Sequence, residues 1–333
     1  MDFVNEIRIY QRFSMRTHYQ NPVFDQYMAD PFVLQHGGNY YAYGTGSLSP
    51  EGWAFPVLHS SDLVNWQQHG WSLIPPGGDE FWAPEVAYQE GVFYMYYSAH
   101  GIDGNDHQLR VATSTDPLGP FRDAGRVLVP DQPFTIDAHP FRDQDGQWYL
   151  FYSQDFLTLD DPYRVGTGIV VDRLLDMFSL AGQPRVVIRP HADWQLFKLQ
   201  RPMYGAVYDW YTIEGAAVRF HNNRYYCFFS GGAWEHDNYG ISYVIADHVL
   251  GPYYYPPGDQ QVLVRSVPGR VIGPGHNSFT RSPDGKQEYI VYHAWDPDMT
   301  ARRMCIDPLH WVNGKPVIHG PTWTPQPLAI PNP

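Results

Sequence analysis

Residues 29–46 read ADPFVLQHGGNYYAYGTG, and this stretch contains the pattern that decides the fold. An acidic residue beside small ones is followed by a short apolar segment, a Gly-Gly-Asn turn and a tyrosine-rich segment. Two such segments joined by a turn predict a β-hairpin. Four later stretches repeat this order, beginning at residues 83, 137, 214 and 276: APEVAYQEGVFYMYYSAH, DAHPFRDQDGQWYLFYSQ, EGAAVRFHNNRYYCFFSGG and HNSFTRSPDGKQEYIVYHAW.

A second recurring phrase lies between the hairpins, as SSDLVNW, TSTDPLGPF and ADHVLGPY, beginning at residues 60, 113 and 246. Each phrase suits the end of an outer strand and the turn that leaves it. Two hairpins per repeat make a four-stranded blade, so the sequence predicts an all-β, five-bladed β-propeller. The alternative is a β-sandwich, or a pair of β domains in which the hairpins recur by coincidence.

The chain lacks the marks of a domain boundary, since no low-complexity linker or block of charge divides it. We therefore expect a single domain over residues 1–333, with residues 1–25 as a lead-in. The proline-rich residues 321–333 are expected to form a strap over the surface. Only residues 171–180 favour a helix-like turn.

The composition narrows the classes of partner. Trp, Tyr and Phe make up 16% of the 333 residues, and aromatic side chains suit both strands and sugar-binding sites. The net charge of −13 disfavours nucleic acid and anionic membranes but is compatible with a neutral oligosaccharide. The two cysteines, Cys227 and Cys305, are too few for a disulfide framework. Residues 1–21 have no apolar core of a secretory signal, and no segment is apolar enough to span a bilayer, so we expect a cytoplasmic protein.

The polar residues that begin the repeats indicate where the chemistry lies. The first strand of each propeller blade lines the central axis. Asp30, Glu85, Asp137, Glu214 and His276 are therefore expected to project into one central pocket. Converging carboxylates repel one another and resist desolvation, which raises the pKa of at least one of them. Core packing gives no reason for such a cluster, so it is a candidate functional site.

Cleavage of a glycosidic bond needs two carboxyl groups in different protonation states. A protonated carboxylic acid gives a proton to the leaving oxygen, while an ionised carboxylate activates water or attacks the anomeric carbon. A third carboxylate near the acid keeps that acid protonated by like-charge repulsion. Asp30, Asp137 and Glu214 can fill these three roles.

The motifs around these residues resemble those of glycoside hydrolase family 43, in the family's order and over nearly the whole chain: Ala29-Asp30-Pro31, Trp82-Ala83-Pro84-Glu85, Ile136-Asp137 with Pro140-Phe141, Glu214-Gly215 and Gly275-His276-Asn277. The resemblance implies a five-bladed propeller and hydrolysis with inversion of configuration. By motif, Asp30 is similar to the general base, Glu214 to the general acid, and Asp137 to the residue that tunes the acid and orients the substrate. The family usually has proline after Glu-Gly, whereas this chain has Ala216, a change that removes no catalytic group.

The resemblance also suggests supporting residues, each with a second interpretation. The matching histidine of the family often faces a calcium ion at the axis, which makes His276 a candidate metal contact; alternatively, His276 hydrogen-bonds a neighbouring carboxylate. Arg303 is expected, in preference to Arg302, to hold Asp137 or a sugar hydroxyl, or else to pair at the surface with Asp307 or a neighbour. For substrate binding, Trp82 and Phe32 are candidate stacking surfaces, with packing between blades as the alternative.

Glu85 is expected to orient the substrate or simply to anchor its strand. The substrate itself is the open question. Known members of the family are mainly α-L-arabinofuranosidases, β-xylosidases and arabinanases, and we expect an exo-acting α-L-arabinofuranosidase acting on arabinose- or xylose-containing oligosaccharides. β-Xylosidase and arabinanase are the alternatives within the family, and a non-catalytic sugar-binding propeller is the alternative from another class. Sialidases fit less well, because SSDLVNW lacks the glycine of their repeated motif. Retaining fructan hydrolases also fit less well, because their Asn-Asp-Pro and Arg-Asp-Pro motifs are replaced here by Ala-Asp-Pro and Ile-Asp-Ala.

Overall fold

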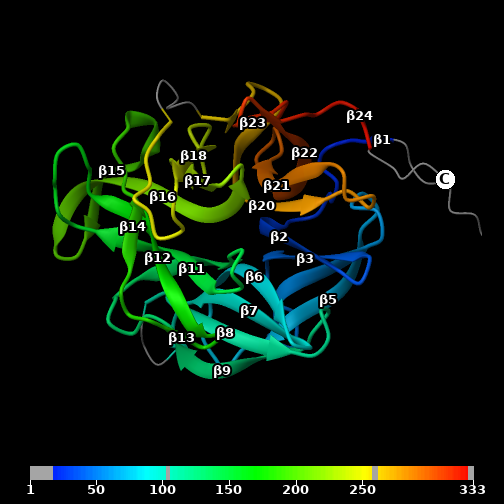
Figure 1. The fold of residues 1–333 in the computed structure, drawn as a ribbon, viewed down its shortest axis with the longest axis horizontal. Coiled ribbons are helices and arrows are strands. Elements are labelled where there is room, and N and C mark those ends of the chain that lie inside the picture. The colour runs from blue at the N-terminus through cyan, green and yellow to red at the C-terminus, as the bar shows by residue number, and fades with distance from the viewer. Residues whose placement is uncertain (1–17, 103–105, 257–261, 329–333) are drawn as a thin grey trace, which may run out of the picture.

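The computed structural model describes residues 18–102, 106–256 and 262–328, and in these the chain is built from β-strands arranged around a centre (Figure 1). The helical structure described is one short 3-10 turn at Asp193–Gln195, so no helix in these ranges is long and apolar enough to cross a membrane. The all-β prediction is confirmed.

The described strands fall into five successive antiparallel units, which we call blades 1 to 5. Blade 1 contains β2 (Ala29–His36), β3 (Asn39–Thr45), β4 (Ala54–Ser60) and β5 (Gln67–Ile74). Blade 2 contains β6 (Phe81–Gln89), β7 (Val92–Ala99), β8 (Gln108–Ser114) and β9 (Phe121–Val127). Blade 3 contains β10 (Thr135–Arg142), β11 (Trp148–Phe156), β12 (Gly166–Asp176), β13 (Ser179–Leu180) and β14 (Arg185–Ile188).

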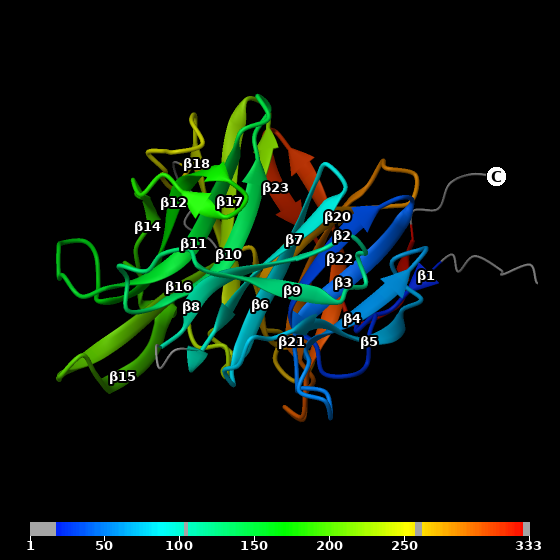
Figure 2. The same ribbon diagram turned by 90° about the horizontal axis from the view of Figure 1, so that it is seen from below.

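Blade 4 contains β16 (Ala206–His221), β17 (Arg224–Gly231), β18 (Gly240–Ala246) and β19 (Val264–Arg265), and β15 (Leu196–Met203) pairs with the beginning of β16. Blade 5 contains β20 (Ile272–Arg281), β21 (Glu288–Trp295), β22 (Arg302–Val312) and β23 (Lys315–Ile318). Short parallel pairings join blade 1 to blade 2 through β5 and β9, and blade 3 to blade 4 through β12 and β16. In Figure 2 the hairpin formed by β15 and the start of β16 projects from one end of the molecule.

The hydrophobic core is divided into five clusters, and each cluster lies between two neighbouring blades. Val33 and Tyr40 of blade 1 pack with Tyr289 and Met304 of blade 5, so the last blade contacts the first. The other four clusters join blade 1 to 2, 2 to 3, 3 to 4 and 4 to 5. Because side chains alternate across a strand, each blade presents one face to each neighbour. This closed series of interfaces is the arrangement of a five-bladed propeller.

The two ends of the described chain meet beside blade 5. β1 (His18–Tyr19) pairs with β24 (Gln326–Pro327), so the parts of the expected lead-in and strap that lie within the described residues lie together. The Asn21 side chain donates to the Ile306 carbonyl at 2.8 Å and accepts from the Ile306 N–H at 2.9 Å. The remainder of both expected segments, residues 1–17 and 329–333, lies outside the described residues.

One expectation about secondary structure is wrong. Residues 171–180 do not form a helix-like turn: they contain the end of β12, a tight turn, and β13, with Leu174 paired to Leu180. Val171 and Leu174 are buried in two different interblade clusters. Contacts on both faces of the strand therefore outweigh the local preference of this segment.

The first strand of every blade contains a bulge at the same place. A residue with positive φ occurs at each bulge: Asp30 (49°), Ala83 (46°), Asp137 (59°), Gly215 (62°) and His276 (49°). The pairing of each strand with the next one shifts register there. We call these five residues the junction residues. Positive φ is unfavourable for residues other than glycine, so the four junction residues that are not glycine must be held by their surroundings.

Hydrogen bonds between blades hold four of the junction residues. The residue paired across from each bulge on the second strand is Thr45, Ser98, Ser153, Ser230 or His293, and all of these except Ser153 accept a hydrogen bond through the side chain. The backbone N–H groups of Ala83, Asp137, His276 and Asp30 donate to side chains of the preceding blade, respectively Thr45 at 2.9 Å, Ser98 at 3.1 Å, Ser230 at 2.6 Å and His293 at 3.0 Å. The fifth junction differs, because the Gly215 N–H donates to the Asp137 carboxylate at 3.1 Å.

The fifth junction provides a matched test of these bonds. Ser98→Ala should lower the free energy of unfolding by about 1–3 kcal/mol, because it leaves the buried N–H of Asp137 without an acceptor. Ser153→Ala should change stability by less than about 0.5 kcal/mol, since the Ser153 hydroxyl is equally buried but has no partner. Chemical denaturation of both variants measures the difference; equal losses would show that the interblade bonds are not what stabilises the junctions.

Candidate active site

Four of the five blades bring four of the predicted residues together at the axis. The His276 Nδ1 atom lies 3.4 Å from Asp30 Oδ1 and 4.0 Å from Asp137 Oδ2. Glu214 directly precedes Gly215, whose N–H binds Asp137, and its carboxyl group interacts electrostatically with both aspartates. Asp30, Asp137 and His276 are buried, while Glu214 is partly exposed. Residues from blades 1, 3, 4 and 5 thus form one site.

Asp30 is surrounded by groups that stabilise its ionised form. Thr45 Oγ1 donates to Asp30 Oδ2 at 2.6 Å, and Arg302 lies 3.4 Å from Asp30 Oδ1. Burial opposes ionisation, but His276 and the Arg302 guanidinium hold the pKa of Asp30 well below its usual range. Asp30 is therefore a carboxylate at neutral pH.

His293 fixes the backbone of Asp30 and is not a cationic partner. Its Nδ1 atom accepts the Asp30 backbone N–H at 3.0 Å, and an accepting nitrogen carries no proton. Complete burial lowers the pKa of His293 to about 4. We therefore assign the neutral ring, and the 3.3 Å separation between Nδ1 and Asp30 Oδ1 is not an ion pair.

Glu214 and Asp137 are in the opposite situation to Asp30. Burial raises the pKa of Glu214, an effect that Asp30 reinforces and that His276 and Tyr239 oppose. Burial also raises the pKa of Asp137, and the neighbouring Glu214 and Asp30 add to the shift. These two carboxyl groups titrate as a pair that holds a proton more strongly than an ordinary carboxylate. The site therefore separates a negative carboxylate from a protonated pair.

His276 occupies the space between the two aspartates. Its burial opposes protonation, but Asp30, Asp137 and Glu214 raise its pKa. Calcium prefers six to eight oxygen ligands. In residues 18–102, 106–256 and 262–328 no group of three or more His, Cys, Asp or Glu side chains is arranged to hold a metal. The protein groups around His276 thus do not by themselves supply the oxygen ligands of calcium; an ion held there through water stays a prediction, and no step below depends on a metal.

Glu85 does not occupy the position expected for it. Asp30, Asp137 and His276 are junction residues, but Glu85 comes two positions after the junction residue Ala83. Its carboxylate binds His139 Nδ1 at 2.7 Å, and His139 Nε2 accepts the Val218 N–H at 3.0 Å. Glu85 adds to the negative field that acts on His276, while its hydrogen bond anchors the third blade.

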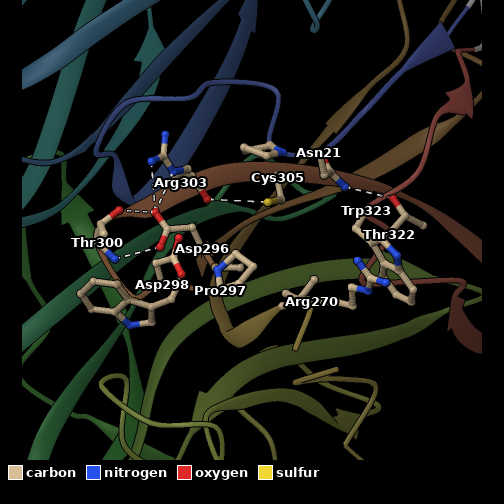
Figure 3. Close-up of a pocket in the computed structure, with 14 residues that line it drawn as sticks. Asn21, Arg270, Asp296, Pro297, Asp298, Thr300, Arg303, Cys305, Thr322 and Trp323 are labelled. Carbon is tan, nitrogen blue, oxygen red and sulfur yellow. Dashed lines mark hydrogen bonds and ion pairs between the residues drawn. The ribbon is translucent and has the colours of Figure 1, made fainter. Parts of the chain in front are cut away.

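Arg303 is not the arginine of the site. Both of its hydrogen bonds go to Asp296 Oδ2, each at 3.1 Å. These residues line a cavity of about 390 Å³ that is not lined by Asp30, Asp137, Glu214 or His276 (Figure 3). Arg302, the neighbour on β22, faces the other way and contacts Asp30. The side chains of adjacent residues in a strand point to opposite faces, so choosing Arg303 in place of Arg302 selected the arginine that faces away from the site.

The aromatic candidates have different surroundings. Trp82 is partly exposed and stacks on His107, with ring centroids 3.5 Å apart, so one indole face is already covered by protein. Phe32 packs against the cluster between blades 1 and 2. Two other rings lie beside the site: the Arg302 guanidinium lies 4.2 Å from the Trp234 ring and 5.9 Å from the Trp295 ring.

Several residues of the site were not found from the sequence. Arg302 was considered and passed over, and Thr45, Tyr239 and His293 were not identified. The Tyr239 hydroxyl donates to Glu214 Oε1 at 2.7 Å. Thr45 is the last residue of β3 and His293 lies two residues before the end of β21; both stand at the pairing position where blades 2 to 4 have serine. That recurring position is the signal by which two of the four could have been recognised.

Comparison with known proteins identifies the family. The model of glycosyl hydrolases family 43 matches residues 19–316. The chain belongs to this family. It is 30% identical, over 87% of its length and 82% of the relative's, to the β-D-galactofuranosidase xynD of Aspergillus niger. It is 24% identical, over 92% of its length and 61% of the relative's, to the extracellular exo-α-(1→5)-L-arabinofuranosidase of Streptomyces avermitilis.

Solved structures agree with this assignment. A thermostable family-43 glycoside hydrolase superposes with a TM-score of 0.82 at 34% identity, covering 94% of this chain and all of the other. An endo-1,4-β-xylanase from Bacteroides thetaiotaomicron superposes with a TM-score of 0.74 at 27% identity, covering 91% and 98%. The family-43 chain is thus a glycoside hydrolase that acts on carbohydrate, which decides against a sugar-binding propeller without activity.

The two arginines provide a test of the electrostatics. Arg302→Met should raise the pKa of Asp30, because the ionised form loses a cation. If activity needs ionised Asp30, the acidic limb of the kcat/KM profile then moves to higher pH. Arg303→Met should leave this limb in place, since Arg303 pairs with Asp296. Identical pH profiles for the two variants would contradict the assignment of Arg302.

Proposed function

We propose that this family 43 hydrolase is an inverting, exo-acting α-L-arabinofuranosidase that releases arabinose from neutral oligosaccharides. The observation that carries the proposal is the opposite direction of two pKa shifts in one site. Asp30 is held ionised by Arg302 and His276, whereas burial favours the protonated form of Glu214. A base and an acid facing one bond are the requirement for inverting hydrolysis.

In the proposed reaction, Asp30 removes a proton from a water molecule as the water oxygen attacks the anomeric carbon. The bond between the anomeric carbon and the glycosidic oxygen breaks, and Glu214 transfers its proton to that oxygen. Asp137 and Glu214 repel each other as like charges, so the pair keeps a proton, which the proposed reaction places on Glu214. Asp137 also accepts the Gly215 N–H, which fixes the backbone next to the acid. The sugar leaves with the opposite anomeric configuration.

The choice of arabinofuranose rests on the ring shape of the sugars for which two relatives are named. One relative is named for β-D-galactofuranose and another for α-L-arabinofuranose. Both are five-membered rings with matching configuration around the ring, and they differ in the exocyclic group. β-Xylosidase and arabinanase remain the alternatives, because a putative β-xylosidase of Xylanibacter ruminicola and an endo-α-(1→5)-L-arabinanase of Bacillus subtilis also match at 25% identity.

The substrate can be tested with p-nitrophenyl glycosides of α-L-arabinofuranose, β-D-galactofuranose and β-D-xylopyranose. The proposal predicts the highest kcat/KM with the arabinofuranoside, and release of single arabinose units from arabino-oligosaccharides. Preference for the xyloside, or internal cleavage of linear arabinan, would replace the proposal by one of the alternatives.

The role of Glu214 can be tested by removing its carboxyl group. Glu214→Ala should lower kcat by at least about 100-fold with oligosaccharides, which need protonation of the leaving oxygen. It should lower kcat much less with a dinitrophenyl glycoside, whose leaving group departs without a proton. An equal loss with both substrates would exclude Glu214 as the acid.

The stereochemistry gives an independent test. Proton NMR of the first product formed from an α-L-arabinofuranoside should show the β anomer before mutarotation. An α anomer as the first product would indicate a retaining reaction and would contradict the role assigned to Asp30.

A further inference from the structure

We propose that Tyr239 is a positioning residue for Glu214, and that residue 275 is glycine because the Tyr239 ring occupies the space of a side chain there. This inference rests on the role of Glu214 as the acid proposed above. It assigns a function to two uncharged residues of blades 4 and 5: Tyr239, which lies outside the motifs quoted above, and Gly275, which stands in one of them.

The contact between Tyr239 and Glu214 is direct. Tyr239 immediately precedes β18, and its hydroxyl donates to Glu214 Oε1 at 2.7 Å. The ring is almost completely buried, with 1% of the residue exposed. Burial and the nearby carboxylates raise the pKa of Tyr239 well above its usual value, so the hydroxyl keeps its proton and remains a donor. One Glu214 oxygen is thereby fixed, and the other is left to face the leaving oxygen.

The neighbouring blade shows why the ring can reach this place. A Cβ atom at Gly275 would lie 2.0 Å from Tyr239 Cε1 and 2.4 Å from Cδ1. These distances are too short for any real contact, and the buried ring has no open space to enter. Gly275 does not have a positive φ, so its backbone conformation does not require glycine. The requirement is for space alone.

Comparison of the blades supports this interpretation. In the first strand of each blade, the residue directly before the junction residue is Ala29, Trp82, Ile136, Glu214 or Gly275, in blades 1 to 5 respectively. Blades 1 to 4 have a side chain at this position, and in blade 4 that side chain is Glu214. In blade 5 the Tyr239 ring from blade 4 fills the equivalent volume.

Tyr239 also connects the acid to the base. Its ring is nearly parallel to the His293 ring, at an interplanar angle of 4° and a centroid separation of 5.8 Å. His293 in turn accepts the backbone N–H of Asp30. Tyr239 and His293 therefore form a stacked pair of neutral rings, with Glu214 bound to one and the Asp30 backbone bound to the other. The pair fixes the spacing of the two carboxyl groups across the interface of blades 4, 5 and 1.

The experiment compares Tyr239→Phe and Gly275→Ala with the wild type on two α-L-arabinofuranosides, or on the preferred glycosides if these differ. One has a poor alcohol leaving group and the other a dinitrophenolate. Each variant should lose about tenfold in kcat with the poor leaving group, the amount expected for a lost hydrogen bond to an ionisable group. KM and the kcat of the dinitrophenyl substrate should change by less than about twofold, because acid catalysis alone is affected.

A double-mutant cycle separates positioning from a general structural effect. In the Glu214→Ala background, Tyr239→Phe should cause no further loss of kcat, because the group that it positions is gone. Tyr96→Phe is the matched control, since Tyr96 is fully buried and its hydroxyl donates to the Met177 carbonyl at 2.9 Å, away from the carboxyl groups. This variant should lose stability but keep the wild-type dependence on the leaving group.

The outcomes distinguish this proposal from the one on which it rests. If Tyr239→Phe lowers kcat equally with both leaving groups, or lowers it further in the Glu214→Ala background, the positioning role is wrong. If Gly275→Ala keeps full activity with the poor leaving group, the space requirement at Gly275 is wrong. If Glu214→Ala itself shows no dependence on the leaving group, the proposed acid fails, and the inference about Tyr239 fails with it.

Discussion

The structure depends on five backbone bulges held in place by hydrogen bonds between blades. At each bulge one residue has positive φ. Three of these residues carry side chains of the site, Asp30, Asp137 and His276, and their surroundings must hold them in this unfavourable backbone conformation. Their N–H groups donate to His293, Ser98 and Ser230 of the preceding blades. Since each bond crosses a blade interface, closing the propeller and assembling the site are one process. The bulges point these side chains toward the axis, whereas a regular strand would point them in another direction.

This shared site produces different protonation states from similar carboxyl groups. The Arg302 guanidinium, on blade 5, forms an ion pair with the Asp30 carboxylate, whereas the Asp137 carboxylate accepts the backbone N–H of Gly215. The cation lowers the pKa of Asp30, and the resulting negative charge helps to raise that of Glu214. The ionised state of Asp30 thereby helps to keep Glu214 protonated. The division of roles is a property of the cluster and not of any single residue.

The fold was predictable because hairpins recur in the sequence, whereas much of the site was not. Asp30, Asp137, Glu214 and His276 stand beside small residues at the start of repeats, and the structure brings them together. Glu85 was misplaced because similar repeats can align two positions apart. Arg303 was preferred to Arg302 because the sequence does not show which of two adjacent residues faces the site. The helix-like turn expected at residues 171–180 is wrong because burial on both faces of the end of β12 overrides local preference. Tyr239 lies outside the repeats, so only its contacts in the structure reveal it: the hydrogen bond to Glu214 within blade 4 and the close approach to Gly275 of blade 5.

The proposed reaction requires that Asp30 is ionised while the pair of Glu214 and Asp137 holds a proton. Neutron diffraction from a deuterium-exchanged crystal near neutral pH tests it most directly, since deuterium positions become visible. We predict no deuteron on either Asp30 oxygen and one deuteron on the carboxyl groups of Glu214 and Asp137. A deuteron on Asp30, or none on the pair, would contradict it.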